Sequence, residues 1–180
     1  MIRFLEEQGV RAVLVLLMGF VIYSVYLQDP VEQSGQAAQG FSLPVLGEDA
    51  YASFEESLGK VTVIDFWATY CGPCRESMPW LQQLYESYSR EELALFSINM
   101  DYGNNDSLRE ERITQFVRSM GIGFPILIDD GSVSRQYRVN QIPHLVIVDR
   151  SGAVRYVHSG NASYEEVRSE IEVLIQEAGG

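Results

Sequence analysis

Cysteine, lysine and histidine are scarce in this chain of 180 residues. It contains two cysteines, two histidines and a single lysine, Lys60, and its 13 basic residues face 25 acidic ones, for a net charge of −12. No basic cluster or stripe exists that could form a nucleic-acid surface. Internal repeats and low-complexity segments are also missing. The acidity is that of a solvated surface, and the apolar fraction of 46% suits one ordinary domain with an additional segment.

The few metal-ligating residues argue against a metal site. A structural zinc site needs four ligands, and Cys71 and Cys74 supply two. The histidines, His144 and His158, lie 14 positions apart and show no finger-like spacing. A purely structural Cys71–Cys74 disulfide would close a very small loop and stabilise little. Redox chemistry is the favoured interpretation, with metal binding and an inert pair as alternatives.

The two cysteines lie where a strand pattern meets a helix pattern. The run Val61–Trp67 is almost continuously apolar, and a helical pattern covers Arg75–Tyr88. At a spacing of three, both sulfurs fall on one face of the first helical turn, close enough for a disulfide. The free N–H groups and the positive end of the helix dipole favour a thiolate at the first sulfur. We therefore expect Cys71 to attack and Cys74 to resolve.

An apolar run, Ala12–Leu27, dominates the N-terminal part of the chain. As a helix its 16 residues would span roughly 24 Å, slightly less than a bilayer core of about 30 Å. Arg3 and Arg11 precede the run, and neither lysine nor arginine occurs from residue 12 to residue 59. The positive-inside rule then places the N-terminus in the cytoplasm and the rest of the chain outside.

Two other interpretations of this run remain. A cleaved signal peptide would need a small-x-small site, but the candidate at Gly35–Ala37 lies well beyond the run, and Glu6 and Glu7 are unusual in a signal peptide. A buried core helix fits poorly with the polar segment that follows. The expected domain division is a cytoplasmic stub (1–11), a transmembrane anchor (12–27), a flexible Gln/Gly/Ala/Ser-rich linker (28–40) and a folded domain (41–180).

The folded domain alternates strand and helix patterns. Expected strands, helices and turns follow in order: edge strand 41–46 with Pro44, capping box Ser53–Glu56, strand 61–67, helix 75–88, strand 93–100, a helix opened by the capping box Ser107–Glu110 and closed by Gly121, strand 124–129, short helix 132–137, strands 145–148 and 154–157 around the turn 149–152, and helix 164–178. This order implies an α/β sandwich with parallel central strands and an antiparallel pair at one edge.

The string Trp-x-x-x-Cys-Gly-Pro-Cys, ending at Cys74, resembles the thioredoxin active site, with Tyr70 where that family usually has a second Trp. Pro79 five residues after Cys74, an extra helix–strand unit at 107–128 and the anchor are similar to the membrane-tethered TlpA/ResA thiol-disulfide oxidoreductases. The resemblance covers about residues 41–178. It implies a thioredoxin-like fold, a central mixed sheet flanked by helices, with an inserted helix–strand unit and an N-terminal transmembrane helix.

Asp65 is an acid inside an otherwise apolar strand, so desolvation should raise its pKa. It matches the buried acid of thioredoxin, which implies proton exchange with Cys74; a hydrogen-bonded carboxyl without a kinetic role is the alternative. Ile142-Pro143 matches the family's cis-proline, with an ordinary trans proline as the alternative. By resemblance, the Ile142 main chain would pair with a substrate strand.

The same resemblance implies that Trp67, Gly72 and Pro73 contact the substrate beside the two cysteines. His144, next to the cis-proline, could stabilise a thiolate, or it could be polar packing in a loop. His158 is expected on the sheet surface. No metal and no cofactor other than the redox-active Cys71–Cys74 disulfide is expected.

The implied function is reduction of disulfides in extracytoplasmic proteins, since Gly72-Pro73 matches thioredoxin, which has a reducing potential of about −270 mV. Apocytochrome c is an expected substrate because many family members act in cytochrome c maturation. Electrons would come from a transmembrane donor of the CcdA or DsbD type. One departure weakens the apocytochrome assignment: the glutamate that such members carry three residues after the second cysteine is Ser77 here, and Glu76 is expected to face about 100° away.

The runner-up is a copper-binding chaperone of the thioredoxin fold, with Cu(I) held by thiolates and a histidine. Such chaperones usually place three residues between the cysteines, whereas only Gly72 and Pro73 separate them here. A thiol peroxidase is disfavoured because its Thr-x-x-Cys arrangement is missing, with Ala68 in the threonine position.

Overall fold

The computed structural model describes residues 15–18, 34–103 and 105–177. The chain divides into two compact units, residues 1–32 and 33–180. In the first unit, residues 15–18 form a helical turn, and the remainder of the predicted stub and anchor lies outside the described residues. Within the described part, no helix has both the length and the apolar character needed to cross a bilayer. The second unit carries the sheet and the cysteines.

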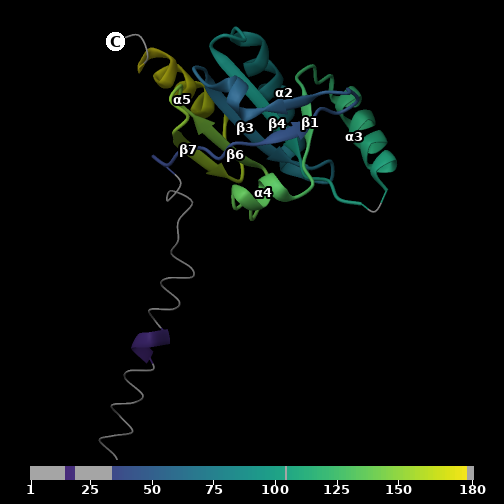
Figure 1. The fold of residues 1–180 in the computed structure, drawn as a ribbon, viewed down its shortest axis with the longest axis horizontal. Helices are drawn as coiled ribbons and strands as arrows, with labels where there is room; N and C mark the ends of the chain where they lie inside the picture. The colour runs from purple at the N-terminus through teal and green to yellow at the C-terminus, as the bar shows by residue number, and fades with distance from the viewer. Residues whose placement is uncertain (1–14, 19–33, 104, 178–180) are drawn as a thin grey trace, which may run out of the picture. The chain divides into compact units, whose positions relative to one another are not determined.

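A five-stranded mixed sheet forms the centre of this second unit, with the strand order β5-β4-β3-β6-β7 (Figure 1). β3 pairs in parallel with β4, and β4 with β5, whereas β6 and β7 add antiparallel strands on the other side of β3. A separate antiparallel hairpin joins β1 and β2. The strands are β1 (Ser42–Pro44), β2 (Tyr51–Ser53), β3 (Val61–Trp67), β4 (Leu93–Asn99), β5 (Ile126–Ile128), β6 (His144–Val148) and β7 (Val154–Ser159).

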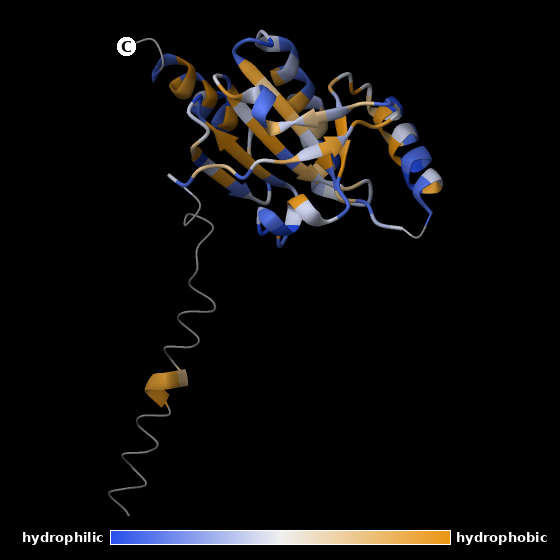
Figure 2. Cartoon of the chain, in the orientation of Figure 1, coloured by the Kyte–Doolittle hydropathy of each residue, from blue (hydrophilic) through white to orange (hydrophobic). Residues whose placement is uncertain are grey.

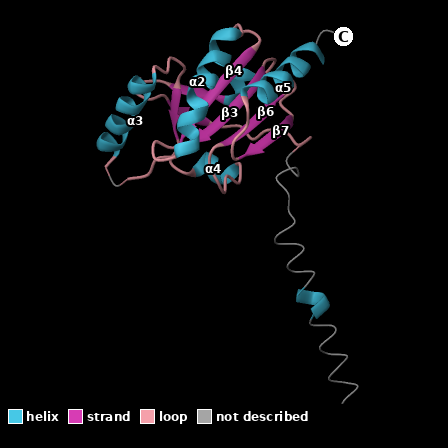
Figure 3. Cartoon of the chain, turned by 180° about the vertical axis from the view of Figure 1, so that it is seen from behind, coloured by secondary structure: helices cyan, strands magenta, loops and turns pink. Residues whose placement is uncertain are grey.

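Helices cover both faces of this sheet. They are the 3₁₀ turn η2 (Phe54–Ser57) and the α-helices α2 (Gly72–Ser87), α3 (Asp106–Met120), α4 (Ser132–Gln136) and α5 (Tyr164–Glu177). Figure 3 shows α2 and α5 in front of the strands when the domain is viewed from behind, while α4 and β1 lie on the side that faces the viewer in Figure 1. The unit is therefore a three-layer α/β sandwich with β3 at its centre.

Successive side chains of β3 point to opposite faces of the sheet, and this alternation produces two layers of hydrophobic core. Val61, Val63 and Trp67 pack with α2, α3 and α5, whereas Ile64 and Phe66 pack with β1, η2 and α4. Every residue of β3 is buried, as expected for a central strand covered on both faces. In Figure 2 the hydrophobic colour accordingly concentrates on the strands. Asp65 occupies the face of β3 that lies beneath α2, which is the layer that contains the cysteines.

The structure confirms the predicted alternation of strands and helices, including the antiparallel β6–β7 pair around Asp149–Gly152. The predicted helical start at Ser53 is confirmed, since Ser53 is the N-cap residue of η2, but neither predicted capping box forms. α3 begins at Asp106 because Asn105, an equally good capping residue, accepts a hydrogen bond from the Leu108 N–H at 3.1 Å. At η2, the Ser53 hydroxyl bonds the Glu55 carboxylate and caps no backbone N–H. β2 was not predicted.

The predicted linker, residues 28–40, is wrong for its last part. Gly35 and Ala38 donate backbone hydrogen bonds of 2.7 Å to the Val154 and Gly152 carbonyls, and the Tyr137 hydroxyl donates to the Gln39 carbonyl. These contacts attach residues 35–39 to the start of β7 and to α4, so the folded domain begins before residue 41. Backbone pairing of this kind needs no particular side chains. The Gln, Gly, Ala and Ser composition of residues 28–40 therefore predicted a flexible linker although part of the segment is paired.

Candidate active site

The junction of β3 and α2 holds the redox pair. Cys71 is the N-cap residue of α2, and Cys74 lies in the first turn of the helix. The two are joined as a disulfide, with their Cα atoms 5.3 Å apart. The Cys74 backbone N–H, one of the donors left free at a helix start, points to the Cys71 sulfur at 3.1 Å. The sequence expectation that Cys71 would lie at the positive end of a helix is confirmed.

The two sulfurs differ in access. Cys71 is 7% exposed and Cys74 is fully buried. Gly72 and Pro73, between them, are both exposed, and Pro73 falls at a helix start, where its missing N–H costs nothing. An external disulfide can therefore approach Cys71 more easily than Cys74, which matches the predicted order of attack.

The buried carboxylate of Asp101 holds the turn that leads to Cys71 by hydrogen bonds, an arrangement called here the Asp101 brace. Asp101, which follows β4, accepts hydrogen bonds from the Thr69 N–H at 2.7 Å and from the Thr69 hydroxyl at 2.6 Å. Arg112 of α3 donates to the same carboxylate through Nε at 3.0 Å, and Asn99 donates through its amide at 3.3 Å. The carboxylate is thus satisfied by charge-assisted bonds and ties β3, β4 and α3 together beside the cysteines.

Asp65 lies in the layer beneath α2 with little to stabilise its charge. Desolvation by burial raises its pKa to about 7, and a long hydrogen bond of 3.4 Å from the Ser97 hydroxyl opposes this only weakly. Asp65 pairs across the sheet with Leu145 of β6, so its neighbours on that side are apolar. The sequence prediction of a raised pKa is confirmed. A carboxyl group with this pKa exchanges protons readily near neutral pH.

A cavity of about 120 Å³ connects Asp65 with the surface near the redox pair. Pro73 of α2 and Pro143 lie in its wall, and the Ile142–Pro143 peptide bond is cis, as predicted. Glu76 and Ser77 also line it, together with Trp80 and the loop 160–162. Glu76 and Ser77 point in different directions from α2, as expected, since Glu76 is exposed and Ser77 is buried, yet both reach the wall of the cavity.

The two predicted substrate-contacting residues Trp67 and Ile142 differ in their burial. Ile142 is half-buried in the loop before β6, beside Pro143. Trp67 is fully buried, and its ring packs against Phe116 with centroids 5.2 Å apart. The prediction that Trp67 contacts substrate is therefore wrong for this state of the protein. The ring supports the site from beneath, because Trp67 shares the face of β3 that carries Val61 and Val63 and packs into the same layer of the core.

His144 supplies no positive charge beside the sulfurs. Burial lowers the pKa of His144 to about 4, with a smaller contribution from His158, so the His144 imidazole is neutral at physiological pH. Its Nδ1 lies 2.9 Å from the Ser159 hydroxyl, and its ring packs on Phe66. A neutral His144 offers no positive charge to a thiolate, and these contacts favour the alternative of polar packing.

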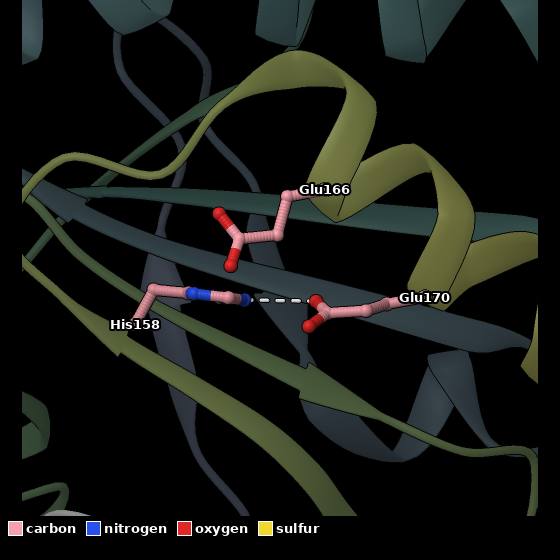
Figure 4. Close-up of side chains that lie close together, drawn as sticks. All are labelled: His158, Glu166 and Glu170. Atoms are coloured by element: carbon pink, nitrogen blue, oxygen red, sulfur yellow. Dashed lines mark hydrogen bonds and ion pairs between the residues drawn. The ribbon is translucent and has the colours of Figure 1, made fainter.

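His158 belongs to a separate cluster with Glu166 and Glu170 (Figure 4). His158 lies on β7, both glutamates lie on α5, and the ligand atoms of the three groups fall within 4.8 Å of one another. His158 Nε2 contacts a Glu170 carboxylate oxygen at 2.8 Å, and the Ser163 N–H approaches Glu166 at the start of α5. His158 was expected on the sheet surface, and there it is only half-buried, because Glu166 and Glu170 of α5 lie against it.

Sequence reasoning missed the brace around Asp101. Thr69 and Asp101 are 32 positions apart, and a lone Asp after a strand resembles any turn former. One signal was present: in parallel neighbouring strands the carboxyl ends meet at one edge of the sheet, and both residues follow such ends, those of β3 and β4.

The raised pKa of Asp65 predicts a specific dependence of stability on pH. The folded state binds this proton more tightly than the unfolded chain, whose carboxyl has a pKa near 3.8, so the stabilisation is complete below that value and is lost as the pH rises toward 7. The loss amounts to roughly 4 kcal/mol. In Asp65→Asn, which has no proton to lose, the free energy of unfolding of the disulfide form should fall much less between pH 4 and pH 8.

Denaturant unfolding of the full chain at a series of pH values measures this difference. Asp49→Asn, at an exposed turn position, is the matched control and should follow the wild type. Parallel curves for the wild type and Asp65→Asn would contradict a strongly raised pKa at Asp65.

Comparison with known proteins agrees with this geometry. The sequence profile of the AhpC/TSA family matches residues 34–157. The thioredoxin-like protein YneN of Bacillus subtilis is 30% identical over 164 residues, covering 89% of this chain and 94% of its own length. The thiol-disulfide oxidoreductase ResA of Halalkalibacterium halodurans is 30% identical over 178 residues, covering 98% and 97%.

Among solved structures, a thiol:disulfide interchange protein DsbE from Chlorobium tepidum superposes with a TM-score of 0.68 at 28% identity, covering 79% of this chain and 97% of its own. None of these relatives supports the copper-chaperone alternative. The chain therefore belongs to the AhpC/TSA family and is a thioredoxin-like thiol-disulfide oxidoreductase.

Proposed function

We propose that the protein is anchored in the cytoplasmic membrane by residues 12–27 and reduces disulfides of extracytoplasmic proteins, with the Cys71–Cys74 pair as its redox group. The observation that carries the redox role is the position of the Cys71 sulfur at the start of α2, 3.1 Å from the Cys74 N–H. A negative sulfur is stabilised there by the helix dipole and by a backbone donor.

In the proposed reaction, the Cys71 thiolate attacks one sulfur of a substrate disulfide. A Cys71–substrate bond forms, and the other substrate sulfur leaves as a thiolate that takes a proton from solvent. Cys74 then loses its proton and attacks the Cys71 sulfur, which releases the second substrate thiol. Two electrons pass to the substrate, and the protein is left with the disulfide seen in the structure.

Asp65 is the proposed acceptor for the Cys74 proton. With a pKa of about 7 it is partly ionised at neutral pH, so it can accept a proton and return it later. The cavity that Asp65 shares with Pro73 and Glu76 provides a route by which that proton reaches solvent. Burial raises the pKa of Asp65, so the carboxyl beneath α2 is neutral for part of the time at neutral pH.

The surface around Cys71 is the proposed contact for substrate. Exposed Gly72 and Pro73 leave the main chain beside Cys71 open, and the Ile142 backbone, next to Pro143, is proposed to pair with an extended segment of the substrate. Gly160 donates a 2.9 Å backbone hydrogen bond to the Pro143 carbonyl and supports this loop from β7.

Reduction is the proposed direction because Gly72-Pro73 matches thioredoxin, whose potential is reducing. Likeness to ResA, a named thiol-disulfide oxidoreductase, supports the exchange chemistry itself. Apocytochrome c is the proposed substrate, which the family resemblance supports. A transmembrane thiol donor of the CcdA or DsbD type would re-reduce the disulfide after each cycle, since the compartment outside the membrane lacks a reducing pool comparable to that of the cytosol.

Substitution of each cysteine in the full chain tests the redox roles. The reduced wild type should reduce a protein disulfide such as that of insulin with turnover in the presence of dithiothreitol. Cys71→Ser should fall to the background rate because no attacking sulfur remains. Cys74→Ser should stop after the first step and accumulate a mixed disulfide through Cys71, detected by mass spectrometry. Turnover by Cys71→Ser would contradict the assignment.

Labelling of intact cells tests the proposed location. Because the chain has only two cysteines, a membrane-impermeant maleimide reports on this site alone, and the double variant Cys71→Ser/Cys74→Ser is the background control. After mild reduction, the wild type should be labelled without permeabilisation. Labelling that requires lysis of the cells would place the site in the cytosol and contradict the proposal.

A further inference from the structure

Two tyrosines form an exposed aromatic surface next to Cys71. Tyr70 directly precedes Cys71, and Tyr102 lies in the loop that follows β4. Their rings meet edge to face, with centroids 5.8 Å apart. The two residues are 62% and 77% exposed, unlike Cys71, which is almost covered. We call this pair, Tyr70 and Tyr102, the tyrosine platform.

The platform is held rigidly from beneath. Asp101, the residue before Tyr102, bonds the backbone N–H and hydroxyl of Thr69, the residue before Tyr70. Arg112 donates through Nε to Asp101 and through a terminal nitrogen to the Tyr102 carbonyl, at 3.0 and 3.4 Å. One hydrogen-bond network, buried at Thr69 and Asp101, therefore fixes the backbone under both rings, although 32 residues separate them in sequence.

Exposed aromatic rings on a fixed backbone are the usual form of an anchor for a binding partner. Large aromatic side chains contribute much of the energy at protein contacts, and an ordered pair loses little entropy when it is covered. Neither tyrosine lines the cavity that contains Asp65, Pro73 and Pro143. The platform is thus a second surface beside Cys71, distinct from that cavity.

We propose that the tyrosine platform binds an apolar side chain next to the substrate cysteine that Cys71 attacks, and that Tyr102 sets a preference for disulfides flanked by aromatic or aliphatic residues. This inference rests on the proposed function. The ring surfaces favour an apolar occupant because covering them removes apolar area from water.

The test uses three peptides, each with one internal disulfide, that differ only in the residue beside each cysteine: Phe, Ser or Arg. The reduced full chain is assayed for kcat/KM on each. We expect the wild type to prefer the Phe peptide over the Ser peptide about 10-fold, the effect of one well-packed aromatic contact. Tyr102→Ala should lose most of this preference through a higher KM for the Phe peptide, and Tyr102→Phe should keep it.

The ratio of the two peptides separates this role from a structural one, because a general distortion of the site slows both peptides alike. Tyr51→Ala removes an equally exposed tyrosine, 69% accessible, from β2 and is the matched control, with an unchanged ratio. An unchanged ratio in Tyr102→Ala overturns the inference, as does a Tyr102-dependent preference for the Arg peptide. If the wild type reduces no disulfide at all, the proposed function fails, and this inference fails with it.

Discussion

The contact between the Cys74 N–H and the Cys71 sulfur, at 3.1 Å, is the interaction on which the rest of this structure depends. It exists because α2 begins one residue after Cys71, so that a free backbone donor and the positive helix end converge on one sulfur. The surrounding fold holds that geometry. β3 delivers the chain from the centre of the sheet, and Asp101 fixes the turn at Thr69 from the neighbouring strand.

Buried charge is used in two opposite ways around this contact. The Asp101 carboxylate accepts four hydrogen bonds from three residues and serves as a fixed anchor. The Asp65 carboxylate has one distant hydroxyl, and its pKa of about 7 allows it to change protonation state. The same residue type thus has a structural place after β4, at Asp101, and a place suited to proton exchange within β3, at Asp65.

Much of this arrangement follows from local sequence pattern. The apolar run at β3, the CxxC spacing and the lone acid Asp65 each carry a one-dimensional signal, and the fold, the redox pair and the raised pKa were predicted from them. The contact between Thr69 and Asp101 joins segments 32 residues apart, and only the order of the parallel strands hinted at it. The pairing of residues 35–39 with the start of β7 carries no local signal, because it is made through backbone groups. The burial of Trp67 against Phe116 likewise depends on tertiary packing and could not be predicted from the local sequence.

Alkylation of the two thiols in the reduced full chain, followed across a range of pH by peptide mass spectrometry, tests the central claim most directly. The account predicts that Cys71 reacts first, with a pKa below the value of about 8.5 for a free cysteine, and that buried Cys74 is protected. A Cys71 pKa at or above the free value, or faster alkylation of Cys74, would show that the start of α2 does not activate the outer sulfur and would contradict the account.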